Sequence, residues 1–341
     1  MDTLTHVLIG ASLAHACQPA QHSDQHLKLS HRVTLGALAA AFPDIDYVTY
    51  LIDPLSFISD WHRAETHSFV LLPLWALLLA LLFTQMTQQK TKLKEAFIIC
   101  CLSLASHIFT DLITSWGTQV FAPISNERYA IGISFVIDPY FSGIILIGLI
   151  TGLFRQNPIA TRAALLCLLM YMAFQTILKI QVLNIARQQM VINQWRGSNI
   201  YTMPQPFSPL HWKIIITSGE HYYLTYINLM KRTHYPFLPL QLDTIIQHYH
   251  PVNALNWQTF SRYGNASESG SIQQAWNQPV FQDYRTFARY PAYYTRTRSA
   301  NELCYWFIDL RFTLPELEPP FIYGVCQNLS DTSQWAVKLH N

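Results

Sequence analysis

The chain has 341 residues, of which 50% are hydrophobic, 13% are aromatic and only 12% are charged, and its formal net charge at pH 7 is +2. Soluble domains usually carry about a quarter charged residues, so this low share indicates a chain that faces lipid for part of its length. The composition excludes an intrinsically disordered chain, a fibrous protein and a disulfide scaffold, and the near-neutral charge offers no evident surface for nucleic acid.

The apolar residues gather in the first half of the chain. Four runs with almost no charged groups follow one another at residues 68–86, 96–110, 139–154 and 163–178. Each run is slightly shorter than the roughly 20 residues that cross a bilayer as a helix, but four in succession favour a membrane bundle over buried core helices. Two weaker helical segments precede them. We therefore expect a mainly α membrane helical bundle in residues 1–182, with about six helical segments of which four are strongly hydrophobic.

After about residue 182 the amino-acid composition of the sequence changes. Charges, prolines and aromatic residues become frequent, and no long apolar run recurs. We expect an amphipathic helix over residues 183–197, followed by strands with hairpin-type turns. The expected strands cover residues 212–217, 222–229, 304–314, 321–329 and 335–340. Residues 183–341 are therefore predicted to form a small soluble α+β domain.

The distribution of lysine and arginine suggests an orientation in the membrane, because these residues collect on cytoplasmic loops. They occur in three connections between helical segments, as Lys28 and Arg32, as Lys90, Lys92 and Lys94, and as Arg155 and Arg162. If these connections are cytoplasmic, the chain crosses the membrane several times, and the other helix ends and the soluble domain are periplasmic or extracellular. Cys304 and Cys326 would pair in such an oxidising compartment, and two buried free thiols are the alternative.

Residues able to bind a metal converge at the outward end of the expected bundle. They are His6, Asp44, Asp46, His62, His67, His107 and Asp111. His107 and Asp111 are four residues apart, so they share one helix face and can hold the same ion. Imidazole and carboxylate ligands together suit zinc, and also manganese or iron. Seven such residues are more than one four-coordinate ion needs, so the pattern also fits a site with several ions.

Each of these residues also has a simpler interpretation. A single histidine in a membrane helix, such as His6, is usually packed or hydrogen-bonded to a neighbouring helix. His107 and Asp111 can form a neutral hydrogen-bonded pair. Asp53 and Asp138 each precede a proline, and we expect both to cap helices. Only the convergence of the cluster favours a metal site over these separate explanations.

Five segments resemble a known family in the same order along the chain. MDTLTHVLIGASLA, AAAFPDIDYV, HRAETHS, SHIFTDLITSWGTQVFAPIS and FVIDPY are similar to segments of the YdjM-type inner-membrane proteins, which are described as membrane-bound metal-dependent hydrolases. The resemblance covers about residues 1 to 145. It implies an inner-membrane location and a hydrolytic activity, and it assigns no activity to the C-terminal domain.

The same pattern is distantly similar to zinc-dependent phospholipase C and the S1/P1 nucleases, which hold three zinc ions. That resemblance implies direct metal ligation by His6, Asp44, His62 or His67, His107 and Asp111. The further histidine and the His-x-x-x-Glu pair of those enzymes have no clear counterpart here. We therefore expect one or two divalent ions, zinc foremost, with manganese or iron as alternatives.

The leading hypothesis is metal-assisted hydrolysis of a phosphodiester or a lipid-like ester at the outer membrane surface, with membrane lipid as the surrounding partner. Arg63 would clamp a phosphate or carboxylate, and Asp46 or Glu65 would act as general base. One alternative is a transporter or ion path, which should carry ionisable groups at several depths. Another is a membrane adaptor in which the metal site only fixes the fold and the C-terminal domain binds an unknown protein.

Overall fold

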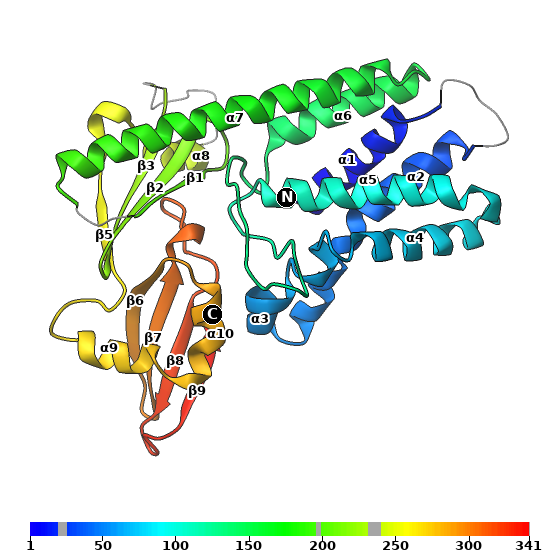
Figure 1. Ribbon diagram of the computed structural model, residues 1–341. Coiled ribbons are helices and arrows are strands. Elements are labelled where there is room, and N and C mark those ends of the chain that lie inside the picture. The colour runs from blue at the N-terminus through cyan, green and yellow to red at the C-terminus, as the bar shows by residue number, and fades with distance from the viewer. Residues whose placement is uncertain (20–25, 196–198, 231–239, 341) are drawn as a thin grey trace. The chain divides into compact units, whose positions relative to one another are not determined.

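The computed structural model describes residues 1–19, 26–195, 199–230 and 240–340 (Figure 1). The chain forms two compact units. The first comprises Met1–Phe57 and Trp61–Ile177, and the second comprises Ile58–Asp60 and Leu178–Asn341. A helical N-terminal part followed by a C-terminal α+β part with antiparallel sheets confirms the expected fold class.

The helical unit contains all six helices that the sequence predicts. They are α1 (Thr3–Ala16), α2 (Leu29–Ala41), α4 (Leu72–Met86), α5 (Leu93–Leu112), α6 (Pro139–Phe154) and the first part of α7 (Ile159–Ile192). Short helical turns connect them, namely η1 (Phe42–Leu51), α3 (Pro54–Ser56), η2 (Phe57–Trp61), η3 (Glu65–His67) and η4 (Lys90–Lys92).

The number of helices able to cross a membrane is smaller than expected. Among the described residues, two helices are long and apolar enough, at Lys90–Leu112 and Ile159–Ile192. A third candidate exists if Pro54–His67 and Leu72–Met86, bent by 70°, form one span. α4 and α6 have only 15 and 16 residues. At 1.5 Å per residue such helices reach roughly 23 Å, which is less than the ~30 Å hydrocarbon core. The four strongly hydrophobic segments are therefore all helical, as α4, α5, α6 and α7, and they provide two or three candidate spans.

α7 continues without interruption for 34 residues, so the expected separation of residues 163–178 from an amphipathic helix at 183–197 was wrong. The segment contains neither proline nor glycine, and its change from apolar to mixed composition does not end the helix. Its second part, from Leu178 on, packs Val182 and Ala186 against buried residues of the C-terminal sheet, including Trp212 and Ile214.

Glycine allows α1 and α2 to touch through their backbones. A Cβ atom on Gly10 would lie 2.3 Å from the carbonyl oxygen of Gly36, and a Cβ atom on Gly36 would lie 2.5 Å from that of Gly10. Small residues at helix crossings permit such close approach between membrane helices. The contact fixes α1, which carries His6, beside the helix that leads into η1.

The expected helix caps are confirmed. The carboxylate of Asp53 accepts hydrogen bonds from the backbone of Leu55 and Ser56, at the start of α3. Asp138 does the same for Tyr140 and Phe141 at the start of α6. In both cases proline occupies the first helical position, where its missing N–H costs no hydrogen bond.

The described residues of the second unit form two sheets. The first sheet has β1 (Asn199–Pro204), β2 (His211–Ser218), β3 (His221–Asn228) and β4 (His250–Pro251) in that order, with β5 (Gln258–Ser261) also paired to β3. The second is an antiparallel sheet of β6 (Pro291–Arg298), β7 (Glu302–Asp309), β8 (Tyr323–Asn328) and β9 (Trp335–Leu339). The remaining helical segments are α8 (Leu240–Gln247), α9 (Ser269–Trp276), α10 (Gln282–Phe287), η5 (Val252–Ala254), η6 (Pro279–Phe281) and η7 (Leu310–Phe312).

The predicted hairpin is present, with Ser218 opposite His221 and a turn that places Gly219 at φ +59°. β1, β4, β5 and β6 were not expected. The end of β1 overlaps the Pro-rich residues 203–209, and β6 begins directly after an aromatic-rich stretch. Buried residues of both sheets form a common core, which includes Ile215 and Trp306. Cys304 and Cys326 on neighbouring strands form a disulfide, so the paired alternative is the one that the structure adopts.

Candidate metal centre

Four separate elements bring metal-binding side chains to one end of the helical unit. α1 supplies His6, η1 supplies Asp44, η3 supplies His67, and the last turns of α5 supply His107 and Asp111. In Figure 1 the start of α1 and the end of α5 lie at the same end of this unit as α3. The side chains of His6, His67, His107 and Asp111 are fully buried, and that of Asp44 is 9% exposed.

The centre of the cluster is a pair of imidazole nitrogens. Nε2 of His67 lies 3.0 Å from Nε2 of His107. The same two atoms lie 3.2 and 3.6 Å from Oδ2 of Asp111. They lie 3.8 and 3.7 Å from Oδ1 of Asp44. Nitrogen and carboxylate ligands thus converge on a common point from three elements.

Hydrogen bonds assign the tautomers of two histidines. Nδ1 of His107 lies 2.6 Å from the carbonyl oxygen of Ala40, which can only accept, so Nδ1 carries the proton. The hydroxyl of Thr110 donates to the carbonyl of Ser106, and therefore accepts from Nδ1 of His6 at 3.1 Å. In both rings the Nε2 lone pair is left for a cation, which is the arrangement that metal-ligating histidines usually show.

The charges at the site leave a surplus of carboxylates. Asp111 contacts the Met1 amino group and lies 2.9 Å from Nη2 of Arg63. Asp44 accepts a hydrogen bond from Thr3 at 2.6 Å. Burial raises the pKa of the Asp44 carboxyl. The hydrogen bond with His67 and the neighbouring imidazoles lower this pKa by a larger amount, so it lies below its ordinary range. With Asp46 included, three carboxylates face two cationic groups, and a divalent cation would balance the excess.

Two buried atoms of the cluster also lack a suitable hydrogen-bond partner among the described residues. They are Oδ2 of Asp111 and Nε2 of His6. Leaving buried polar atoms without a partner costs about 1–3 kcal/mol each, unless another group satisfies them. Both atoms are metal-ligand types, so the donor set fits a divalent ion.

In the part of the chain that the structure describes, possible ligand atoms lie within 4.8 Å of one another in two groups of three residues. One group is His6, Asp44 and His107, and the other is His67, His107 and Asp111. Because His107 belongs to both groups, they describe neighbouring positions in one centre. This geometry is compatible with one ion or with two.

Asp46 and His62 lie beside this centre. Oδ2 of Asp46 is 3.2 Å from Nδ1 of His62 and 3.6 Å from Nδ1 of His67, and it accepts a hydrogen bond from the backbone N–H of Arg63. The ring of His62 packs between Tyr47, Phe57 and Trp116. The structure therefore distinguishes two histidines that the sequence could not separate. His67 faces the cluster, whereas His62 faces Asp46.

Arg63 is buried and has φ +60°, an uncommon conformation for a residue with a side chain. Its guanidinium donates to Thr114 as well as pairing with Asp111, and its carbonyl accepts from the backbone of Gln119. These contacts direct Arg63 towards the Asp111 carboxylate. Its expected action as a substrate clamp stays a prediction.

Glu65 has a different environment from the other expected site residues. Its side chain is exposed, and its carbonyl oxygen accepts a hydrogen bond from Nε1 of Trp75. Glu65 is absent from both groups of possible ligands found among the described residues. Its expected role as general base therefore stays a prediction.

Sequence reasoning missed the groups that orient the ligands. The carbonyl of Ala40 and the hydroxyl of Thr110 fix the rings of His107 and His6. A backbone carbonyl carries no sequence signal. Thr110 does carry one, since it is a polar residue that directly precedes Asp111 in the last turns of α5.

Comparisons with known proteins concern the helical part of the chain. The model of the family described as YdjM inner membrane protein matches residues 1–182, which contain the whole cluster. Uncharacterized protein YfhP of Bacillus subtilis (strain 168) is 30% identical over 143 residues, which are 41% of this chain and 42% of that protein. The similarity thus spans less than half the length of this relative. No solved structure matches the chain.

Proposed function

This chain belongs to the YdjM inner membrane protein family, and from that premise we propose that its helical unit is a membrane-bound metal-dependent hydrolase. One or two divalent ions, zinc foremost and manganese or iron otherwise, are held by His6, Asp44, His67, His107 and Asp111. The observation that carries the proposal is the pair of Nε2 atoms of His67 and His107, 3.0 Å apart and both facing Oδ2 of Asp111.

When bound, such an ion lowers the pKa of its water ligand to about 7, so that hydroxide is present at neutral pH, and it polarises a phosphoryl or acyl oxygen. The protein residues prepare the site for that chemistry. The hydroxyl of Thr66 hydrogen-bonds with Nδ1 of His67 at 2.9 Å, Asp46 adds a negative charge 3.6 Å from the same atom, and Ala40 holds the ring of His107. Arg63 balances the charge of Asp111 inside the bundle. Burial of the ligands excludes bulk water and strengthens these electrostatic interactions.

We propose a phosphodiester or a lipid-like ester as the substrate. The segment η1, which supplies Asp44, and Ile52 directly after it expose apolar side chains next to the cluster. Val48, Leu51 and Ile52 are 60%, 85% and 74% exposed. Exposed apolar residues next to a site favour a lipid-like substrate or a membrane surface over a small soluble ion. This feature supports delivery of the substrate from the bilayer.

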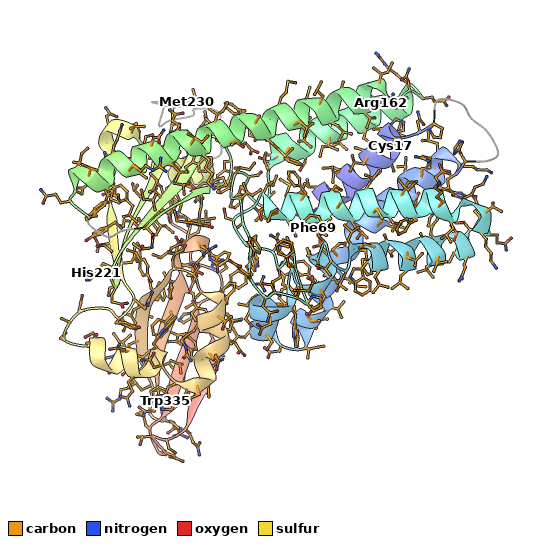
Figure 2. All side chains as sticks on the ribbon, viewed as in Figure 1. Cys17, Phe69, Arg162, His221, Met230 and Trp335 are labelled. Carbon is orange, nitrogen blue, oxygen red and sulfur yellow. A yellow bond between two sulfur atoms is a disulfide. The ribbon has the colours of Figure 1, made fainter. Side chains whose placement is uncertain are left out.

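We also propose a multi-pass topology in which the metal centre and the C-terminal unit face the periplasm. The basic connections support it, because the C-terminal end of α1, the α4–α5 turn and the α6–α7 turn lie together at the end of the helical unit away from α3 (Figure 1). In Figure 2, Cys17 and Arg162 lie at this end, away from Phe69. The disulfide between Cys304 and Cys326 supports an oxidising compartment for the C-terminal unit.

The proposal is tested by hydrolysis assays on the full chain in detergent, loaded with zinc or manganese, with an aryl phosphodiester and a short-chain phospholipid. We expect metal-dependent turnover that falls by at least about a hundredfold in Asp111→Asn, since loss of a ligand removes the ion. His31→Gln is the matched control, because His31 contacts Gln89 outside the cluster. The absence of turnover with both substrates and both metals, or equal turnover in Asp111→Asn, would contradict the proposal.

A second candidate function is a metal site that only stabilises the fold of a membrane adaptor. The complete burial of His6, His67, His107 and Asp111 favours it, because a structural site needs no open position. In that case metal removal would lower the melting temperature of the full chain, while no substrate would be hydrolysed. Thermal unfolding with and without chelator, measured beside the hydrolysis assay, separates the two functions.

A further inference from the structure

Residues 45–52, which include most of η1, form an exposed apolar surface beside the metal centre. Six large apolar or aromatic side chains in this stretch are between 42% and 85% exposed, namely Ile45, Tyr47, Val48, Tyr50, Leu51 and Ile52. The only charged residue of the stretch is Asp46, which is buried and faces His67. So many neighbouring apolar side chains on a surface mark a contact with lipid or with another protein.

Helix lengths favour lipid as that contact. α4 and α6 both run between the end of the helical unit that holds the metal centre, called the metal end, and the end that carries the basic connections, called the basic end (Figure 1). Their 15 and 16 residues extend roughly 23 Å. The hydrocarbon core of a bilayer is about 30 Å thick, so roughly 7 Å of it stays uncovered by these helices. The segments that join the helices at one end can fill this remainder.

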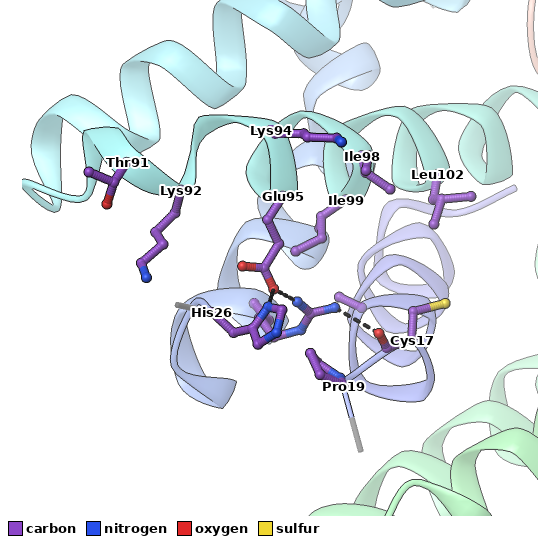
Figure 3. A pocket seen from close by; sticks show the side chains of 12 residues that line it. Cys17, Pro19, His26, Thr91, Lys92, Lys94, Glu95, Ile98, Ile99 and Leu102 are labelled. Carbon is purple, nitrogen blue, oxygen red and sulfur yellow. Dashed lines mark hydrogen bonds and ion pairs between the residues drawn. The ribbon is translucent and has the colours of Figure 1, made fainter. Parts of the chain in front are cut away.

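The basic end carries side chains that stay in the headgroup layer. Lys90, Lys92 and Lys94 lie at the start of α5, and Arg155 and Arg162 lie beside the α6–α7 turn. Figure 3 shows the side chains of Lys92 and Lys94 pointing away from each other at the start of α5. Charged groups at helix ends reach for the headgroups and resist burial in hydrocarbon. The missing length of α4 and α6 is therefore expected at the metal end, where η1 lies.

Other segments of the metal end have the same apolar character. Phe69 and Val70, directly before α4, are both exposed, and so is Ile124, in a loop whose Val120 carbonyl accepts from the backbone N–H of Phe69. The exposed Asp53 ends the apolar stretch and caps α3. One lipid leaflet accounts for all of these separate apolar segments together.

We propose that residues 45–52 are embedded in the leaflet opposite the basic connections, with Leu51 and Ile52 among the acyl chains and Tyr47 at the boundary with the headgroups. Amphipathic segments of this kind enter that boundary by roughly 5–10 Å, which matches the missing helix length. The metal centre then lies within the outer part of the leaflet. The proposal does not depend on the hydrolase function, because the lipid contact requires neither metal nor turnover.

The test is photo-crosslinking of the full chain in phospholipid bilayers. A diazirine amino acid replaces Leu51, or Val48 in a second variant, and mass spectrometry identifies the molecule that the photolysed group captures. Leu169, which is 59% exposed on the candidate span α7, is the lipid reference. Val252, an apolar residue of the C-terminal unit that is 40% exposed, is the matched control. We expect phospholipid as the main product at Leu51, Val48 and Leu169, and water as the main product at Val252.

Melting temperatures show whether each labelled variant is folded, and the two labels on η1 report independently. Water as the main product at both η1 positions would overturn the proposal, because the segment would then face the aqueous phase. Capture of the C-terminal unit or of a second protein chain at both positions would overturn it too. Hydrolysis assays on the same preparations keep the two proposals apart, since lipid capture without turnover supports the leaflet contact and contradicts only the hydrolase function.

Discussion

The role of Asp46 can be separated from that of Asp44 by exchanging each for asparagine. The two residues lie two positions apart on η1, but of these two only Asp44 has an oxygen among the possible ligand atoms. Asp46 instead lies 3.6 Å from Nδ1 of His67, on the side of the ring away from Asp111. Asp44→Asn removes a ligand, whereas Asp46→Asn removes only a nearby charge, because Nδ1 of His67 keeps its hydrogen bond with the hydroxyl of Thr66 at 2.9 Å.

The expected magnitudes follow from these contacts. Groups that orient a ligating histidine typically contribute 10–100-fold to metal affinity. Because 3.6 Å is longer than a normal hydrogen bond, we expect about tenfold weaker binding for Asp46→Asn, or about 1.4 kcal/mol. We expect a loss of more than about a hundredfold for Asp44→Asn.

The assay is competition for zinc between the purified full chain and a chromogenic chelator of known affinity. Both variants replace a carboxylate by an amide of the same shape. The melting temperatures of the two variants and wild type therefore show whether a loss of zinc affinity comes from misfolding. Equal losses in the two variants, or wild-type affinity in Asp44→Asn, would refute the assignment of the two residues.

Three further predictions concern packing, pH and the disulfide. Gly10→Ala should lower the thermal stability of the full chain, by about 1–3 kcal/mol, because its Cβ would overlap Gly36, whereas Gly143→Ala, with nothing within 4 Å, should not; equal melting temperatures would contradict the close helix contact. Burial lowers the pKa of His211 to about 4, while an unfolded histidine titrates near 6.5. Between these values the unfolded chain binds the extra proton, so the stability of β2 should fall by up to about 3 kcal/mol as pH drops from 6.5 to 4. Hydrogen exchange of β2 amides in the full chain measures this loss, and His211→Phe should abolish it; an unchanged pH dependence in that variant would refute the cause. Reduction of the disulfide, which joins residues 22 apart, should destabilise the C-terminal unit by about 3 kcal/mol in the same exchange experiment, and unaltered protection would contradict this expectation.

The fold class and the helix positions followed from the sequence because apolar runs and capping residues act locally. Asp138 before Pro139 marks the start of α6, and the structure places the cap there. The length of a helix is less local. α7 was divided too early because its composition changes near residue 180, although its hydrogen bonding continues to Ile192. The strands β1 and β6 escaped prediction because their partners across the sheet provide the pattern that their own sequences lack.

For the candidate site, the spacing of the residues predicted that they lie at one end of the bundle. It did not predict which way each side chain points. His62 and His67 are equivalent in the sequence. The left-handed backbone at Arg63 turns the chain between them, so that one faces Asp46 and the other faces Asp111. The ion pair between Arg63 and Asp111 also depends on tertiary contacts, so the sequence could not predict it.

The central claim is that His67 and His107 hold a metal ion together with the surrounding carboxylates. Its most direct test is elemental analysis of the full chain purified without chelator, compared with His67→Ala, His107→Ala and the matched variant His62→Ala. We predict one or two divalent ions per chain in wild type and in His62→Ala, and loss of bound metal in His67→Ala and His107→Ala. A metal-free wild type after loading with zinc, or full retention of metal in His67→Ala and His107→Ala, would contradict the claim.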